Sequence, residues 1–293
     1  MTPRRILVPL DGSALAEAAL PPARSFAERL GATLVLLHVL EREPPREVHG
    51  EPHLATAADA TAYVERRAAS LREAGVEVVV DVHERPVSDV AAAIDQHAHE
   101  HDADLIAMCA HGRSNLRDRL LGSIAERILR GGSIPILLRT VRRADPREFR
   151  LHDVIVPLDF DHDVERALDA ARAIAPAYGA GVTLLSVAEP SSSPASRLLP
   201  ASTALAREFA TEEVRRRLEA LADGLRPQLE HVRVIASAGR PAAAILDLTR
   251  TLPDSLVVLV TDAHGGLSSW YDPSTGRQLL ARANLTLLLI KEP

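Results

Sequence analysis

Short apolar runs alternate with longer amphipathic segments along the whole chain. Five runs in the first half have the length and character of single buried strands: 5–10, 33–39, 76–82, 105–108 and 134–138. The segments between them have helical character: about 14–30, 57–74, 88–100 and a helix that begins at 122–123. Alternating strands and helices predict an open, doubly wound parallel sheet with helices on both faces.

The same pattern starts again after a charged connector. The stretch VIVPLD at 154–159 repeats ILVPLD at 6–11, and TLLSV at 183–187 repeats the end of the second strand, both at an offset of 148 residues. A His-Gly pair and a final apolar run also recur in each half. This internal duplication predicts two similar five-stranded α/β domains in tandem: 1–142 and 151–293.

Composition narrows the classes of function. The net charge of −6 and the aromatic content of 3% argue against nucleic-acid binding, which uses basic patches and stacking aromatics. No apolar segment approaches the roughly 18 residues needed to span a bilayer, and Pro9 and Asp11 interrupt the N-terminal apolar stretch. A single cysteine fits a reducing compartment. We expect a cytoplasmic protein without nucleic-acid or membrane partners.

Two loops at strand ends carry residue types that suit a phosphorylated ligand. Nine residues separate Gly112 from Gly122-Ser123 at a helix start, where free N–H groups and the helix dipole favour an anion. Asp11 ends the first strand. Each feature also has an ordinary structural explanation, because Asp11 can cap a turn and Gly122-Ser123 can simply begin a helix. Arg113 equally suits a solvated basic face.

Both halves resemble the universal stress protein domain, and the whole chain is similar to a tandem universal stress protein. The resemblance is carried by ILVPLDGS at the first strand, LLHV at the second and AHGRSNLRDRLLGSIAERIL after the fourth. The ATP-binding members of that family have the pattern G-x-x-G-x9-G-[S/T]. Gly112 and Gly122-Ser123 match its latter part, whereas Cys109 replaces the first glycine.

The resemblance implies a flavodoxin-like sheet with ATP, with or without Mg²⁺, at the carboxyl ends of its strands. Residues at the ends of strands would surround the nucleoside: Pro9, Asp11, Val39, Met108 and Cys109. The glycine loop and the helix after it would hold the phosphates: Gly112, Arg113, Gly122, Ser123 and Ile124. If the family glycine needs a positive φ, the side chain of Cys109 would weaken binding.

The second half departs from this pattern. Asp159 matches Asp11, but Phe160-Asp161 replaces Gly-Ser after it, and further acidic residues follow at 163 and 165. The glycine loop has Gly276 one residue late and no Ser or Thr after it, with Trp270-Tyr271 inside the loop. Like charge near phosphates is unfavourable in a partly desolvated cleft. We therefore expect a degenerate second site.

The chain shows no P-loop pattern and no Ser-His-Asp arrangement that can be placed, so an ATP-binding stress sensor or switch with an unidentified protein partner is the leading hypothesis. Slow ATP hydrolysis is the most enzymatic activity expected. A nucleotide-free interaction module of the same fold is the main alternative. An enzyme of the wider adenine-nucleotide α-hydrolase-like group would carry a Ser-Gly-Gly-rich loop, where this chain has Asp11-Gly12-Ser13.

Two smaller features have ordinary explanations from sequence alone. Cys109 at a strand end is best interpreted as a small buried hydrophobic residue rather than a nucleophile. His97 and His101 share one face of a helix while His99 points away, so only two of the three can converge, and the helix dipole explains them more simply than a metal does.

The last strand of each half, at 134–138 and 285–290, would leave an apolar sheet edge. In similar proteins such strands pair across a dimer axis. The sequence leaves open whether they pair within this chain, as a pseudo-dimer, or between two chains, as a homodimer.

Overall fold

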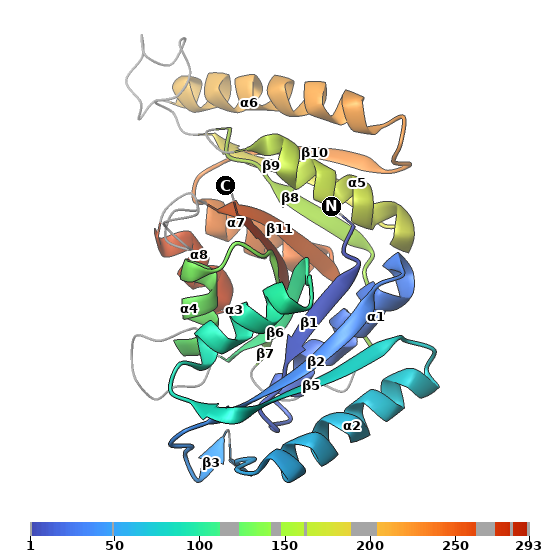
Figure 1. Ribbon diagram of the computed structural model, residues 1–293. Coiled ribbons are helices and arrows are strands. Elements are labelled where there is room, and N and C mark those ends of the chain that lie inside the picture. The colour runs from blue at the N-terminus through green and yellow to red at the C-terminus, as the bar shows by residue number, and fades with distance from the viewer. Residues whose placement is uncertain are drawn as a thin grey trace.

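The computed structural model describes residues 2–48, 50–111, 123–141, 148–160, 163–188, 204–261, 273–281 and 284–291. Ten strands form one continuous sheet in the order β10-β9-β8-β11-β12-β7-β6-β1-β2-β5 (Figure 1). Neighbouring strands are parallel within each half and antiparallel where β7 meets β12. The prediction of two parallel five-stranded sheets in tandem is confirmed, and the two are joined edge to edge.

The main-sheet strands of the first half are β1 (Arg5–Pro9), β2 (Thr33–Glu41), β5 (Val78–Val87), β6 (Leu105–His111) and β7 (Ile136–Val141). Its helices are η1 (Ala16–Ala19, a 3₁₀ helix), α1 (Leu20–Leu30), α2 (Ala57–Glu73), α3 (Val90–Glu100) and α4 (Ser123–Gly131). The strands of the second half are β8 (Asp153–Pro157), β9 (Gly181–Ala188), β10 (Val232–Ala238), β11 (Ser255–Thr261) and β12 (Thr286–Lys291). Its helices are α5 (Val164–Tyr178), α6 (Ala204–Leu225), α7 (Pro241–Thr251) and α8 (Pro273–Leu280).

Two apolar cores cover the two faces of the sheet, and each core contains residues from both halves. Helices α1, α2, α5 and α6 pack on one face, and α3, α4, α7 and α8 on the other. Figure 1 shows α3, α4 and α8 on one side of the strands, with α1 and α5 on the opposite side. Among the described residues, no helix is both long and apolar enough to cross a membrane.

The first helical segment differs from the prediction of one helix over about 14–30. The chain forms η1 and then begins α1 at Leu20, with Pro21 and Pro22 in the first turn. Proline has no N–H to donate, so it is tolerated at the start of an α-helix but interrupts one that is already running. Gly31 ends α1 with a φ of 72°, as the sequence indicated.

The polar segments next to β5 also differ from expectation. The predicted loop over 41–56 contains a small hairpin of β3 (Glu47–Val48) and β4 (Glu51–Pro52). The strand predicted at 76–82 continues to Val87, through the polar residues HERP. Because β5 is an edge strand of the sheet, these side chains reach water and leave no apolar signal in the sequence.

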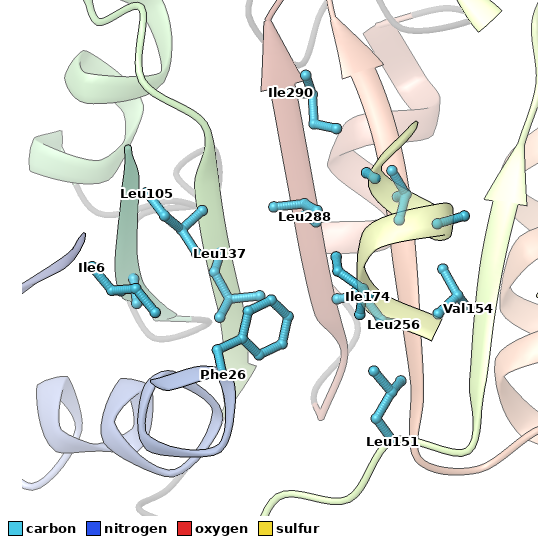
Figure 2. Packing of buried hydrophobic residues seen from close by; sticks show 14 of the residues in the cluster. Ile6, Phe26, Leu105, Leu137, Leu151, Val154, Ile174, Leu256, Leu288 and Ile290 are labelled. Carbon is cyan, nitrogen blue, oxygen red and sulfur yellow. The ribbon is translucent and has the colours of Figure 1, made fainter. Parts of the chain in front are cut away.

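The two halves meet at a seam, defined here as Ile136–Arg139 of β7 paired antiparallel with 286–289 of β12. Leu137 lies directly opposite Leu288, and both belong to the same apolar cluster as Phe26 of α1 (Figure 2). The question left open by the sequence is answered in part, because the last strands pair within the chain. Each strand thereby covers the apolar edge of the other.

Lys291, the only lysine of the chain, continues this contact beyond the seam. Its ammonium is buried and donates hydrogen bonds to the carbonyl of Ile128, at 3.1 Å, and to the carbonyl of Gly132. Burial lowers the pKa of Lys291. These carbonyls lie at the C-terminal end of α4, where a cation complements the helix dipole. The second half thus fixes one end of a first-half helix.

We predict that the seam contributes strongly to stability. Leu137→Ala and Leu288→Ala should each lower the free energy of unfolding by about 2–5 kcal/mol, because each leaves a cavity between the halves. The two side chains face each other, so the double variant should show a coupling energy of about 0.5–3 kcal/mol in urea unfolding. Phe209→Ala is the control, because the 46% exposed Phe209 should contribute within about 0.5 kcal/mol. Strictly additive effects of the two seam substitutions would contradict the prediction.

Candidate functional site

A cavity of 260 Å³ opens at the carboxyl ends of the first-half strands. Within the sheet, β2 lies next to β1 on one side, and β6 lies next to β1 on the other side. The direction in which successive strands are added therefore reverses between β1 and β6. Open α/β sheets bind ligands at such a reversal, where the loops diverge and leave a crevice. The cavity lies at this position, bordered by the ends of β1, β2 and β6 and by α3 and α4.

Six of the ten residues predicted for the site line this cavity: Pro9, Asp11, Val39, Met108, Cys109 and Ile124. Ser123 is the first residue of α4, and its side chain lies outside the described part of the chain. Gly112, Arg113 and Gly122 also lie outside the described residues. The structure therefore brings the expected nucleoside-lining residues together beside the start of α4.

Asp11 organises the turn that follows β1. Its Oδ1 accepts hydrogen bonds from the Ser13 N–H at 2.9 Å and from the Ser13 hydroxyl at 2.7 Å. The Ser13 Oγ in turn accepts a hydrogen bond, at 3.1 Å, from the N–H of Ala16, the first residue of η1. Gly12 between them has a φ of +91°, and a Cβ there would lie 2.9 Å from Leu54. Asp11 thus caps a turn and lines the cavity as well.

Cys109 fits its strand without strain. In the described part of the chain, only Asp102, Asp254 and Asn284 combine a side chain with a positive φ. The backbone at Cys109 therefore does not require glycine, and the cysteine pairs regularly with Arg139 of β7. Its thiol is buried, and burial raises the pKa of Cys109 to about 12. The thiol is protonated at neutral pH, as expected for a buried apolar residue.

Two histidines that the sequence interpretation did not assign to the site also line the cavity. The buried His38 ring donates from Nδ1 to the Leu10 carbonyl at 2.7 Å, and burial lowers the pKa of His38. Its Nε2 and the Nδ1 of His53 have no hydrogen-bond partner among the described residues. Unpaired buried nitrogens are unfavourable, so a polar occupant or water would complete them. The signal in the sequence was a histidine within the apolar run LLHV.

The matching region of the second half is built differently. Phe160 occupies the position of Gly12, and the Arg217 guanidinium carbon lies 3.7 Å from the centre of its ring. Asp163 caps α5 by accepting from the Arg166 N–H at 3.3 Å. Gly276 lies inside α8, away from its start. Positions 161, 262, 265, 270 and 271 of the expected degenerate site lie outside the described residues.

Residues 2–139 and 151–291 each match the sequence model of the universal stress protein family. The chain belongs to the universal stress protein family. Universal stress protein MJ0577 of Methanocaldococcus jannaschii is 26% identical over 158 residues, which cover 46% of this chain and 93% of that protein. The match on both halves confirms the family and its tandem arrangement.

Solved structures of the family share the fold over the whole chain. A universal stress protein from Archaeoglobus fulgidus superimposes with a TM-score of 0.70 at 18% identity, covering 99% of this chain and 98% of that one. A putative universal stress protein from Pseudomonas aeruginosa has a TM-score of 0.65 at 19% identity, covering 99% and 93%. These similarities show that the fold of the whole chain, both halves included, occurs in other solved structures.

We predict that His38 makes the protein less stable in acid. Its folded pKa lies below the ordinary value of 6.5, so the unfolded chain binds this proton more readily. The contribution of this residue to stability should therefore be fully present above pH 6.5 and be lost as the pH drops through the folded pKa, with a slope of at most about 1.4 kcal/mol per pH unit. His38→Asn, which keeps a donor for Leu10, should remove this contribution in urea unfolding between pH 8 and 5.

The matched control is His152→Asn, because the His152 side chain is 68% exposed. Its substitution should leave the acid dependence almost unchanged. If His38→Asn and the wild-type protein lose stability with the same slope, burial of His38 does not govern its protonation.

We predict that Cys109 is unreactive in the folded protein. A pKa of about 12 against an ordinary 9.0 leaves roughly a thousand-fold less thiolate at pH 8. Because the chain has one cysteine, labelling with a chromogenic disulfide reagent reports this thiol alone. Labelling should be slow in the native protein and fast in guanidinium, and similar rates in both would contradict the prediction.

Proposed function

We propose that the first half binds an adenine nucleotide, with ATP as the leading candidate, and acts as a sensor or switch rather than an efficient enzyme. The observation that carries the proposal is the cavity at the reversal of strand order, lined by six residues of the expected set. In this proposal residues 1–142 are the nucleotide-binding domain and residues 151–293 the degenerate one. The chain is a tandem universal stress protein whether or not the first half binds a nucleotide.

The chemistry of the cavity suits a nucleoside with its phosphates directed outward. Val39, Met108 and Ile124 offer apolar surface for a base and sugar, and Asp11 offers carboxylate oxygen for ribose hydroxyls. A volume of 260 Å³ is slightly below the range of about 300–1,000 Å³ for whole-ligand pockets. The phosphates would therefore extend toward the N-terminal N–H groups of α4.

The residues of the second half support the proposal that the chain has one nucleotide site, in the first half. Phe160 occupies the position of Gly12, and Gly276 is displaced from the start of α8. A side chain in place of the first glycine, and no glycine at the helix start, both hinder a phosphate from approaching the backbone closely. We propose that this half serves the assembly through the seam and binds no nucleotide with comparable affinity.

Binding rather than turnover fits the cavity best. Among the described residues that line it, there is no lysine, and the Cys109 thiol is protonated. Phosphoryl transfer depends on positioned charge around the transferred group, so slow hydrolysis is the most that we propose. A nucleotide-induced change near the start of α4 would alter the surface presented to a protein partner.

We predict that Asp11→Asn weakens nucleotide binding roughly 10-fold or more, because a carboxylate that accepts hydrogen bonds contributes about 1.5–3 kcal/mol. Asparagine keeps an oxygen for the Ser13 turn, so folding should be preserved. Affinities for ATP, ADP and AMP are measured by calorimetry on the nucleotide-stripped protein. Asp159→Asn, at the matching position of the second half, is the control and should leave affinity unchanged.

Absence of co-purified nucleotide after acid extraction, together with no thermal shift in ATP, ADP or AMP, would overturn the proposal. That result would favour the alternative, a nucleotide-free interaction module of the same fold. Equal losses from Asp11→Asn and Asp159→Asn would contradict the assignment of the site to the first half.

A further inference from the structure

A second cluster of polar side chains lies at the edge of the sheet, on β5 and the C-terminal end of α3. The Asp81 Oδ2 lies 2.7 Å from His97 Nδ1 and 2.7 Å from His101 Nε2. One ligand atom from each of these three residues lies within 4.8 Å of the others. The His97 side chain is 10% exposed, while Asp81 and His101 are 21% and 24% exposed. The cluster is therefore buried on one side and open to water on the other.

The geometry of His97 is unlike that of a simple hydrogen-bonded pair. Its Nδ1 is close to the Asp81 carboxylate, yet this buried nitrogen has no aligned hydrogen bond within the described part of the chain. Its other nitrogen, Nε2, is hydrogen-bonded to His83 Nδ1 at 2.8 Å. When the Nε2 of His97 carries the proton and donates it to His83, the lone pair on the Nδ1 of His97 faces the cluster. Metal-binding histidines are typically oriented in this way by a partner on the second ring nitrogen.

The second half shows that the fold does not need polar residues here. Asp81 pairs with Leu37 of β2, and Ile235 pairs with Leu185 of β9, which is 148 positions after Leu37. Ile235 therefore occupies the place of Asp81. It packs against the apolar core on the same face of the sheet.

The helices give the same comparison. At the end of α3 the His101 N–H donates to the His97 carbonyl at 2.9 Å, and at the end of α7 the Leu252 N–H donates to the Leu248 carbonyl at 2.7 Å. Leu248 and Leu252 also pack against the apolar core. In the second half, two leucines and an isoleucine that pack against one apolar core thus occupy the positions where the first half has two histidines and an aspartate.

We propose that Asp81, His97 and His101 form a binding site for a divalent transition-metal ion, with Zn²⁺ as the first candidate and His83 orienting His97. Two imidazole nitrogens and a carboxylate oxygen are ligands of the kind that zinc takes, and imidazole selects against Mg²⁺ and Ca²⁺. Because Asp81 and His101 are partly exposed, water can supply a fourth ligand, and the Glu100 Oε2, 3.5 Å from His97 Nδ1, is near enough to supply it instead. The ion would connect α3 to the edge strand β5.

The ligand atoms must shift to hold an ion. A tetrahedral ion with ligand bonds of about 2.1 Å separates its ligand atoms by about 3.4 Å. The Asp81 oxygen must therefore move about 0.7 Å away from each imidazole nitrogen, and ligand atoms that now lie up to 4.8 Å apart must approach by as much as about 1.4 Å. Asp81 and His101 are partly exposed and can move by these amounts. The ion would also neutralise the carboxylate beside two imidazoles, which then act as neutral ligands.

The test uses the whole 293-residue chain, stripped with a chelator and free of nucleotide, so that its outcome does not depend on the proposed function. Zn²⁺ affinity is measured by competition with a chromophoric chelator, and Co²⁺ replaces Zn²⁺ for visible spectroscopy. We expect one ion per chain and a tetrahedral or five-coordinate Co²⁺ spectrum. His97→Gln and His101→Gln should each weaken binding about 100-fold or more, and His83→Leu about 10–100-fold.

His99→Gln is the matched control, because His99 lies on the same helix but contacts the Asp95 carbonyl, with its side chain 57% exposed. It should leave affinity and spectrum unchanged. The triple variant Asp81→Ile, His97→Leu and His101→Leu copies the second half. It should fold, as shown by circular dichroism, and bind no metal.

Failure to bind one equivalent of Zn²⁺ or Co²⁺ would overturn the proposal and leave the cluster as a hydrogen-bonded contact between α3 and β5. Binding that persists in the triple variant, or that is lost in His99→Gln, would also overturn it, because the ion would then lie elsewhere.

Discussion

The antiparallel pairing of β7 with β12 is the interaction on which the rest of the structure depends. Each strand is apolar on both faces and would otherwise end a sheet with unpaired N–H and C=O groups. Pairing them makes both apolar cores continuous across the two halves. The same contact brings Lys291 to the C-terminal carbonyls of α4. The helix proposed to hold phosphate at one end is thus anchored by the second half at the other.

Most of the fold could be predicted from sequence because its strands are buried on both faces. Such strands are continuous apolar runs, and the duplication gave two observations of each. The differences arose where burial does not determine the pattern. The polar end of β5 is a strand only because it pairs with β2, and Pro21 and Pro22 divide a segment whose periodicity alone indicates one helix. The pairing of the seam depends on contacts between positions about 150 residues apart, which no local pattern contains.

The same distinction, between features that follow from the sequence pattern and features that depend on distant contacts, applies to the candidate site. Pro9, Asp11 and Met108 were expected from the resemblance to the family, and their places at strand ends agree with the edge at which an open parallel sheet binds its ligands. His38 and His53 were not, because their importance lies in ring nitrogens left without partners by the surrounding packing. The histidines of α3 show the limit most clearly. The sequence spacing placed His97 and His101 on one face of a helix, and interaction with the helix dipole was the favoured explanation. Asp81, the third residue of the cluster, lies on a strand and therefore has no place in the helical pattern.

The register of the seam has a consequence for how such chains associate. Arg139 faces Thr286, whose hydroxyl accepts a hydrogen bond from the guanidinium at 2.8 Å. In the first half, the position that matches Thr286 is Pro135, which has neither a hydroxyl nor an N–H. Two copies of the first half would therefore meet less well than the first half meets the second. At this contact the first half is complementary to the second half rather than to another copy of itself, and the covalent linkage fixes a one-to-one ratio of the two halves at any dilution.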